Sequence, residues 1–164
     1  MTMPAMTTSA EPARPQGLLD RVLYLTTLVP HWLIALLARV ALLRVFWWSA
    51  RTKVADGTLF TLSDSAVYLF QEEYKLPLVP PEIAAHLALL GESVFSVLVI
   101  LGLATRLGAL GLFFMTLVIQ VFVYPESYNE HVPWMVCALY LVKFGGGFLS
   151  LDALIARRLG RTSL

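Results

Sequence analysis

The longest apolar segment of the chain runs from Glu82 to Tyr124, EIAAHLALLGESVFSVLVILGLATRLGALGLFFMTLVIQVFVY. Nearly all of its residues are apolar, and a single arginine, Arg106, stands near its middle. A helix crosses a bilayer with about 20 mostly apolar residues at ~1.5 Å of rise each. The stretch therefore predicts two membrane-spanning helices. Because the connection at Thr105-Arg106 is so short, the two helices must lie antiparallel and adjacent.

The rest of the chain has the same character. It has 164 residues, of which 58% are hydrophobic and 14% charged, with a mean hydropathy of +0.73. This composition is typical of a membrane protein rather than a soluble globule, and the net charge of +1 gives no reason to expect a nucleic-acid partner. We place four spans, which predict an all-α integral membrane four-helix bundle, at residues 31–50, 82–104, 106–124 and 132–149.

The flanking segments differ from the spans. Residues 1–16 are rich in Pro, Thr and Ala and are interpreted as a disordered tail, residues 17–159 as the membrane domain, and residues 160–164 as a C-terminal tail. Between Gly17 and Val29 the apolar spacing predicts a helix near the membrane interface, interrupted by Pro30; an extended first span is the alternative. Residues 150–159 predict a short cytoplasmic surface helix.

The distribution of Lys and Arg predicts the orientation. One side of the membrane holds Arg14, Arg21, Arg106, Arg157, Arg158 and Arg161, and the other holds Arg51, Lys53 and Lys75. By the positive-inside rule, both termini and Arg106 face the cytoplasm, and the first and third loops face outward.

The first outward loop is predicted to contain an amphipathic helix. Ser63 or Asp64 is a plausible N-cap, and Val67, Phe70 and Tyr74 share one face. We interpret this helix as a lid across the outer mouth of the bundle. A surface helix that merely covers apolar side chains is the alternative.

Two opposite charges inside the spans carry the main functional hypothesis. Glu92 lies on a narrow face of small side chains, and Arg44 of the preceding span is the simplest partner for it. Arg39 points about 140° away from Arg44, and we assign it no partner. The pair is either a structural ion pair or part of a site for a polar ligand or protons. Trp47 and Trp48 flank Arg44 and fit either cation–π contacts or an interfacial aromatic belt.

Polar residues also gather toward the outer side. Thr116, Gln120 and Tyr124 form a ladder at spacings of four along the third span, which suits hydrogen bonding or ligand contact. A metal or proton site is one hypothesis for His86, His131, Glu126 and Glu130; hydrogen-bonding histidines are the alternative. The single cysteine, Cys137, excludes a disulfide framework or a CxxC pair.

With these elements placed, the chain resembles the DoxX family. The resemblance rests on RVFWWSARTK (residues 44–53), on Glu92, on LGLATR (101–106) and on GFLSLD (147–152). It implies a small inner-membrane protein, with relatives that include a subunit of a thiosulfate:quinone oxidoreductase and members of membrane-associated oxidative-stress complexes. A looser resemblance of the segment from Leu69 to Pro81 points to metal-stress gene clusters. The positions that match the family pattern are Arg44, Lys53, Glu92, Arg106 and Asp152.

The leading hypothesis is therefore a membrane redox accessory that binds a quinone or a partner oxidoreductase within the bundle, without a cofactor motif of its own. Arg44 and Glu92 would orient the polar head, and Trp side chains would flank the ring. The candidate ligand-binding residues are Arg44, Trp47, Trp48, Lys53, Glu92 and Gln120. One alternative is a metal-handling transport protein, which would have to be a homo-oligomer because four helices are few for a transporter. The other is a non-catalytic scaffold at the lipid bilayer.

Overall fold

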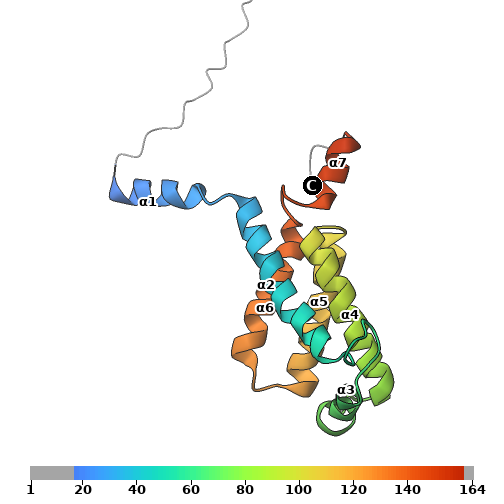
Figure 1. Cartoon of the computed structure of the whole chain (residues 1–164). Coiled ribbons are helices and arrows are strands. Elements are labelled where there is room, and N and C mark those ends of the chain that lie inside the picture. The colour runs from blue at the N-terminus through green and yellow to red at the C-terminus, as the bar shows by residue number, and fades with distance from the viewer. Residues whose placement is uncertain (1–16, 161–164) are drawn as a thin grey trace, which may run out of the picture. The chain divides into compact units, whose positions relative to one another are not determined.

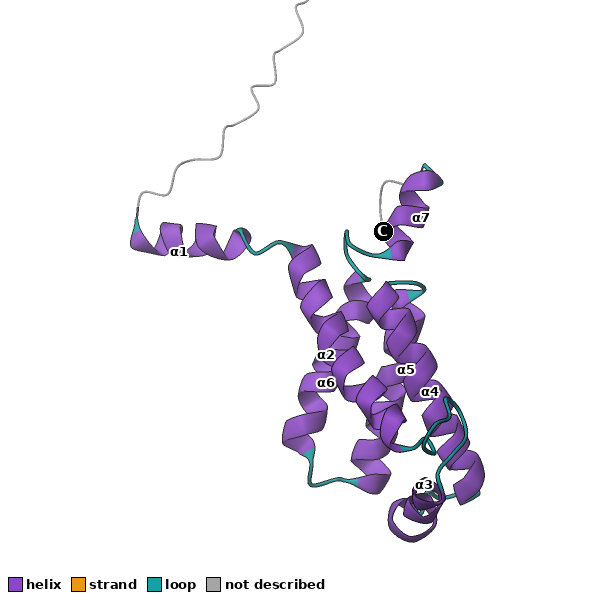
Figure 2. Cartoon of the chain, viewed as in Figure 1, coloured by secondary structure: helices purple, strands orange, loops and turns teal. Residues whose placement is uncertain are grey.

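The computed structural model describes residues 17–160, without the side chains of Asp20 and Thr26, and its regular elements in this range are all helices (Figure 1). Figure 2 shows these helices joined by loops, and the described range adds only an isolated bridge between Val54 and Leu62. The all-α prediction is confirmed. The tails predicted at 1–16 and 160–164 lie outside the described residues except for Gly160.

The chain divides into two units, residues 1–30 and residues 31–164. In the first unit, α1 (Leu18–Thr27) is a separate amphipathic helix whose described side chains are exposed. The helix predicted between Gly17 and Val29 is therefore confirmed, and the alternative of an extended first span is wrong. The helix ends before Pro30 because proline lacks the N–H that a continuing helix needs.

Three helices of the second unit are long and apolar enough to cross a membrane. They are α2 (His31–Thr52), α4 (Pro81–Leu101), and α5 (Thr105–Val118) with its π-helical continuation η2 (Ile119–Val123). Their bounds lie within three residues of the predicted spans. The connection between α4 and α5 is as short as predicted, and Gly102 and Ala104 both take left-handed backbone conformations in it. This is a multi-pass membrane protein.

The fourth predicted span, residues 132–149, has the wrong bounds. The corresponding helix, α6 (Tyr128–Phe144), has 17 residues and ends five residues earlier than predicted. At ~1.5 Å per residue it is about 26 Å long, short of the ~30 Å hydrocarbon core. It ends because Gly145 and Gly147 have φ values of 77° and 75° and turn the chain away.

The long helices pack side by side. α2 contacts α4 and α6, and α5 contacts the same two helices. The centre of this packing is filled by large apolar side chains, with Phe46, Leu42, Leu112 and Leu141 almost fully buried. The small face predicted on α4 is buried as expected, with Ala85 and Ser96 without exposed surface.

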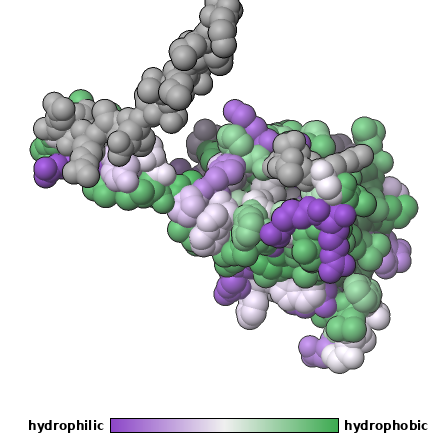
Figure 3. Space-filling view, turned by 90° about the horizontal axis from the view of Figure 1, so that it is seen from above, coloured by the Kyte–Doolittle hydropathy of each residue, from purple (hydrophilic) through white to green (hydrophobic). Residues whose placement is uncertain are grey.

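The outer faces of these helices remain apolar. Large hydrophobic side chains such as Leu37, Leu87, Phe114 and Val136 are exposed, and Figure 3 shows hydrophobic residues over much of the visible surface of this unit. A soluble monomer rarely exposes so much contiguous apolar surface. The surface therefore suits contact with lipid.

Arg39 joins three segments at the end of the unit where α2 begins. Its guanidinium donates hydrogen bonds to the carbonyl oxygens of Val99 (2.9 Å), Gly146 (3.1 Å) and Leu149 (2.7 Å), and also to that of Ile100. Arg39 is only 3% exposed. The residue that had no assigned partner thus holds the end of α4 and the turn after α6 with backbone carbonyls alone.

Asp152 fastens the same end. It lies in α7 (Leu151–Arg158), whose N-cap is Ser150 as predicted. Its carboxylate accepts hydrogen bonds from the backbone N–H groups of Ala104 and Thr105 and from the Thr105 hydroxyl, at 2.8 to 2.9 Å. Asp152 therefore caps the N-terminus of α5 from a distant part of the chain. Its negative charge lies at the positive end of the α5 dipole, which is a favourable interaction.

The predicted amphipathic helix of the first loop forms at the opposite end. It consists of α3 (Asp64–Leu69) and a π-helical turn, η1 (Phe70–Tyr74). Ser63 is the N-cap, because its hydroxyl accepts a hydrogen bond from the Ala66 N–H. Phe70 is buried against Ala84 and Ala85 of α4, whereas Glu72 and Glu73 are exposed. The predicted separation of the two faces is confirmed.

Candidate functional site

A buried ion pair lies between α2 and α4 near the first loop. The ammonium of Lys53 is 2.9 Å from Oε2 and 3.1 Å from Oε1 of Glu92. Ser49 completes the group, because its hydroxyl donates to Glu92 Oε1 (3.1 Å) and accepts from Lys53 (2.8 Å). Lys53 is 5% and Glu92 3% exposed. Each charge is thus removed from solvent and held by several hydrogen bonds.

The local backbone positions Lys53. It follows directly after α2, one turn beyond Ser49, so that both side chains point to the same face. The loop is fixed there because the Lys53 carbonyl accepts a hydrogen bond from the Ser63 N–H (3.0 Å), beside the bridge between Val54 and Leu62. The hydrogen bond between Lys53 and Ser63 therefore fixes both the ammonium-bearing residue and the start of the loop helix α3.

The predicted pairing of Arg44 with Glu92 is wrong. At 100° per residue, Arg44 lies about 180° around α2 from the buried Ala35, on the side away from α4. Its guanidinium instead stacks over the ring of Trp48, 4.6 Å from the centroid, and both side chains are exposed. Lys53 pairs with Glu92 instead. It lies 18 residues after Ala35, which is five full helical turns, so it points to the same side of α2 as the buried Ala35.

The tryptophans predicted to flank a ligand ring also lie elsewhere. Trp48 is 62% exposed, and Trp47 lies under the guanidinium of Arg51 at 4.7 Å. Exposed tryptophans on a spanning helix fit the interfacial belt that was the alternative interpretation. The aromatic side chains near the ion pair come from other segments, namely Tyr74, Phe114, Tyr124 and Trp134.

The ion pair lines a cavity of about 550 Å³. The cavity lies among α2, α4, α5, α6 and the two π-helical turns, and its wall is largely apolar, with Leu87, Met115, Val118 and Trp134 among its residues. Its polar groups come from Ser49, Lys53, Tyr74, Glu92, Tyr124, Ser127, Glu130 and His131. Its size and its few convergent polar groups are typical of a pocket for a small organic molecule.

Two tyrosines of the cavity wall meet, Tyr74 at the end of η1 and Tyr124 directly after η2. The Tyr124 hydroxyl donates a hydrogen bond to the Glu73 carboxylate, and the rings of Tyr74 and Tyr124 meet edge to face with centroids 5.6 Å apart. Burial raises the pKa of Tyr124, and the adjacent Glu73 carboxylate raises it further; burial also raises the pKa of Tyr74. Both hydroxyls therefore remain protonated donors at neutral pH.

His131 presents a ring nitrogen at the same cavity. The Gln120 side chain donates through Nε2 to the Pro125 carbonyl (2.7 Å), which leaves its Oε1 to accept from His131 Nδ1 at 2.8 Å. With Nδ1 protonated, Nε2 of a neutral His131 ring is an acceptor. Gln120, a predicted ligand-binding residue, is not in the cavity wall but orients a residue that is.

The predicted metal-ligand set is not brought together. His131 and Glu130 line the cavity, whereas the exposed His86 contacts the carbonyl of Glu82 (2.9 Å), and Glu126 is also exposed. Within residues 17–160, no three His, Cys, Asp or Glu side chains gather in a way that would hold a metal ion. His131 and His86 thus take the hydrogen-bonding roles that were the alternative.

The family follows from a comparison with known protein families. The model of the DoxX family matches residues 34–125, which is more than half of the chain. The chain belongs to the DoxX family. Among curated proteins and among solved structures, nothing matches it. The region shared with other DoxX proteins includes Ser49, Lys53 and Glu92, and it ends before α6 supplies His131 and Trp134.

Sequence reasoning found part of this DoxX site. Lys53 and Glu92 were both candidates, but as separate positions, and Ser49 was missed although it stands one turn before Lys53. Tyr124 was recognised as part of a polar ladder, and Tyr74 as part of the lid. Their meeting is a contact between segments 50 residues apart, which no local pattern predicts.

Proposed function

We propose that this DoxX protein is a membrane redox accessory that binds the head group of a quinone in the cavity beside Lys53 and Glu92. The observation that carries the proposal is the combination of an apolar cavity with a buried, hydrogen-bonded cation at its wall. A quinone head is an apolar ring with carbonyl oxygens, which need hydrogen-bond donors. Lys53 and Tyr74 carry donors and line the cavity, whereas the Tyr124 hydroxyl already donates to Glu73.

The cavity wall also supports a route for an apolar tail. Leu87, Phe114 and Val118 line the cavity and are at the same time 61%, 54% and 41% exposed on the outer faces of α4 and α5. Because these faces suit contact with lipid, a hydrophobic tail that leaves the cavity here would enter the bilayer. A soluble substrate would gain nothing from such an opening.

The ion pair has a defined role in this proposal. Reduction of a quinone places negative charge on its oxygens, and the Lys53 ammonium would stabilise that charge because it is held in a site of low polarity. Glu92 keeps Lys53 in place and neutralises it when no ligand is bound. Reduction to the quinol takes two electrons, which would come from a partner oxidoreductase, and two protons, which would come from solvent.

The proposed location is the inner membrane with both termini in the cytoplasm. Arg106, Lys143, Arg157 and Arg158 lie in or near the segments at the end where α5 begins. At the other end Arg51 and Lys53 are held by hydrogen bonds within the protein, and Lys75 is exposed beside Glu72. The positive-inside rule then places the cavity near the extracytoplasmic surface.

The test combines extraction with titration. Purified protein is extracted with organic solvent and analysed for quinones by mass spectrometry, and binding of a short-chain quinone is followed by quenching of tryptophan fluorescence. Val118→Trp, which fills the cavity mouth at an exposed position, and Lys53→Met are expected to lose binding. Arg44→Met is the matched control outside the cavity and is expected to bind normally. Absence of co-purified quinone together with equal quenching in all variants would overturn the proposal.

A further inference from the structure

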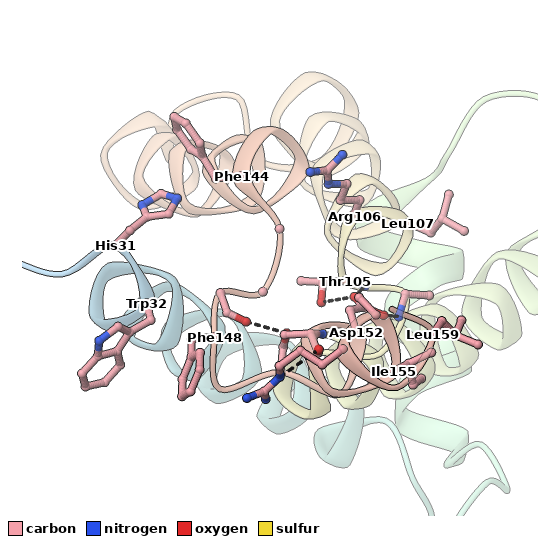
Figure 4. A pocket seen from close by; sticks show the side chains of 18 residues that line it. His31, Trp32, Thr105, Arg106, Leu107, Phe144, Phe148, Asp152, Ile155 and Leu159 are labelled. Atoms are coloured by element: carbon pink, nitrogen blue, oxygen red, sulfur yellow. Dashed lines mark hydrogen bonds between the residues drawn. The ribbon is translucent and has the colours of Figure 1, made fainter. Parts of the chain in front are cut away.

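A second cavity lies at the opposite end of the same unit. Its volume is about 660 Å³, and it shares no residue with the cavity beside Lys53. Figure 4 shows it between Arg106 and Phe144 on one side and Phe148, Asp152 and Ile155 on the other. The start of α2, the start of α5, the turn after α6, and α7 all contribute to it. Helices that span the bilayer begin here, so the cavity lies at the level of the lipid head groups.

The charges in this cavity favour an anion. Arg106 and Arg157 are its basic residues, and Asp152 is its acidic residue. Both Asp152 oxygens already accept hydrogen bonds from Ala104 and Thr105, so the carboxylate is occupied in capping α5. The local balance is one positive charge.

The two arginines differ in how they are held. The Arg157 guanidinium donates to the Ala153 carbonyl (3.2 Å) and lies over the Phe148 ring at 4.6 Å. The Arg106 side chain is exposed, and its guanidinium forms no hydrogen bond or ion pair with any residue between 17 and 160. Its guanidinium is therefore available, with donors in a planar arrangement that matches phosphate oxygens.

The remaining wall distinguishes a lipid from a small soluble anion. Most of the lining is apolar, and the large side chains Trp32, Phe144, Phe148, Ile155 and Leu159 are exposed around it. A free phosphate ion would touch little of this surface. An acyl chain would cover it while the phosphate reached Arg106.

We propose that this cavity binds an anionic phospholipid, with the phosphate on Arg106, Arg157 at the rim and an acyl chain along the apolar wall. Basic pockets among membrane helices are suited to anionic head groups, since charge attraction and apolar burial act together. The proposal is independent of quinone binding at the other end, because the two cavities are separate. It predicts that the lipid fastens α7 to the ends of α5 and α6.

The experiment is native mass spectrometry of the full chain released from detergent micelles, with phosphatidylglycerol or phosphatidylcholine of the same acyl chains added. Wild type is expected to retain phosphatidylglycerol at least tenfold more tightly than phosphatidylcholine. Arg106→Gln is expected to bind phosphatidylglycerol about tenfold more weakly, as for one lost charge-assisted hydrogen bond. Arg106→Lys should keep most of the preference, because it keeps the charge.

The matched control is Arg158→Gln, which removes an exposed positive charge of α7 outside the cavity wall. It should bind like wild type, which separates a site at Arg106 from general attraction to a basic surface. Equal losses in both glutamine variants would overturn the proposal. So would equal retention of the two lipids, or displacement of phosphatidylglycerol by equimolar inorganic phosphate, which would indicate a small-anion site.

Discussion

The buried pair of Lys53 and Glu92 gives the sharpest prediction of the structure. In Lys53→Met the apolar side chain keeps roughly the length of lysine but removes the charge and its donors. Glu92 then loses both hydrogen bonds from Lys53 and keeps only the one from the Ser49 hydroxyl, at 3.1 Å. The carboxylate remains 3% exposed and cannot recover its loss from bulk solvent.

The expected magnitude follows from this geometry. Removing one partner of a buried ion pair costs about 3–5 kcal/mol of unfolding free energy, because it leaves an uncompensated buried charge. Replacing both partners by apolar residues removes that charge, and such replacements are often neutral or stabilising. Lys53→Met is therefore expected to lose about 3–5 kcal/mol, and the double variant Lys53→Met/Glu92→Leu to recover about 2 kcal/mol or more of it.

The assay is reversible unfolding by sodium dodecyl sulfate in mixed micelles, followed by circular dichroism. The four proteins of the cycle are wild type, both single variants and the double variant. Arg44→Met is the control, since this exposed charge lies on the other side of α2, and its effect is expected to stay within about 0.5 kcal/mol. A loss below about 1 kcal/mol in Lys53→Met, or losses that simply add in the double variant, would show that the pair is solvated and not a buried ion pair.

Three further outcomes are expected. Asp152→Ala removes the acceptor for the Ala104 and Thr105 N–H groups and should lower the unfolding free energy by about 1–3 kcal/mol, with a smaller loss in Asp152→Asn, both read from chemical unfolding. Gly146→Ala places a methyl group 2.7 Å from the Thr105 hydroxyl and should cost about 1–3 kcal/mol in the same assay; an unchanged midpoint would contradict the close packing. Because the pKa of Tyr124 is raised above its ordinary 10.0, its contribution to stability is complete below pH 10.0 and is lost as the pH rises further, so unfolding profiles of wild type and Tyr124→Phe should converge in that range.

The overall architecture was largely accessible from the sequence. Hydropathy and length located three spanning helices because backbone hydrogen bonds in lipid must be satisfied within a helix. The fourth helix was placed too late, because the predicted span ran to residue 149 and included Gly145, Gly146 and Gly147, which form the turn around Arg39. Hydropathy does not detect such a turn, because its residues are small or apolar.

The partners of the charged residues were less accessible. Helix geometry places Arg44 and Arg39 about 140° apart around α2, so only one of them can face the other helices. The structure buries the face that contains Arg39 and exposes Arg44. Which of the two stripes faces α4 depends on packing between helices, and the sequence pattern of α2 is apolar all round. Lys53 was counted among the cations of the outward side and named as a ligand-binding candidate, but its burial under the first loop, which folds back over it, was not predicted.

The carbonyl contacts of Arg39 have a consequence for how the protein is made. Ribosomes synthesise the chain in order, so Arg39 is made 107 residues before Gly146. Until then half of the acceptors for this guanidinium do not exist, and an isolated helix carrying it is costly to release into hydrocarbon. We therefore expect stable insertion of the first spanning helix to depend on synthesis of the chain through Leu149, which supplies the last of these carbonyls.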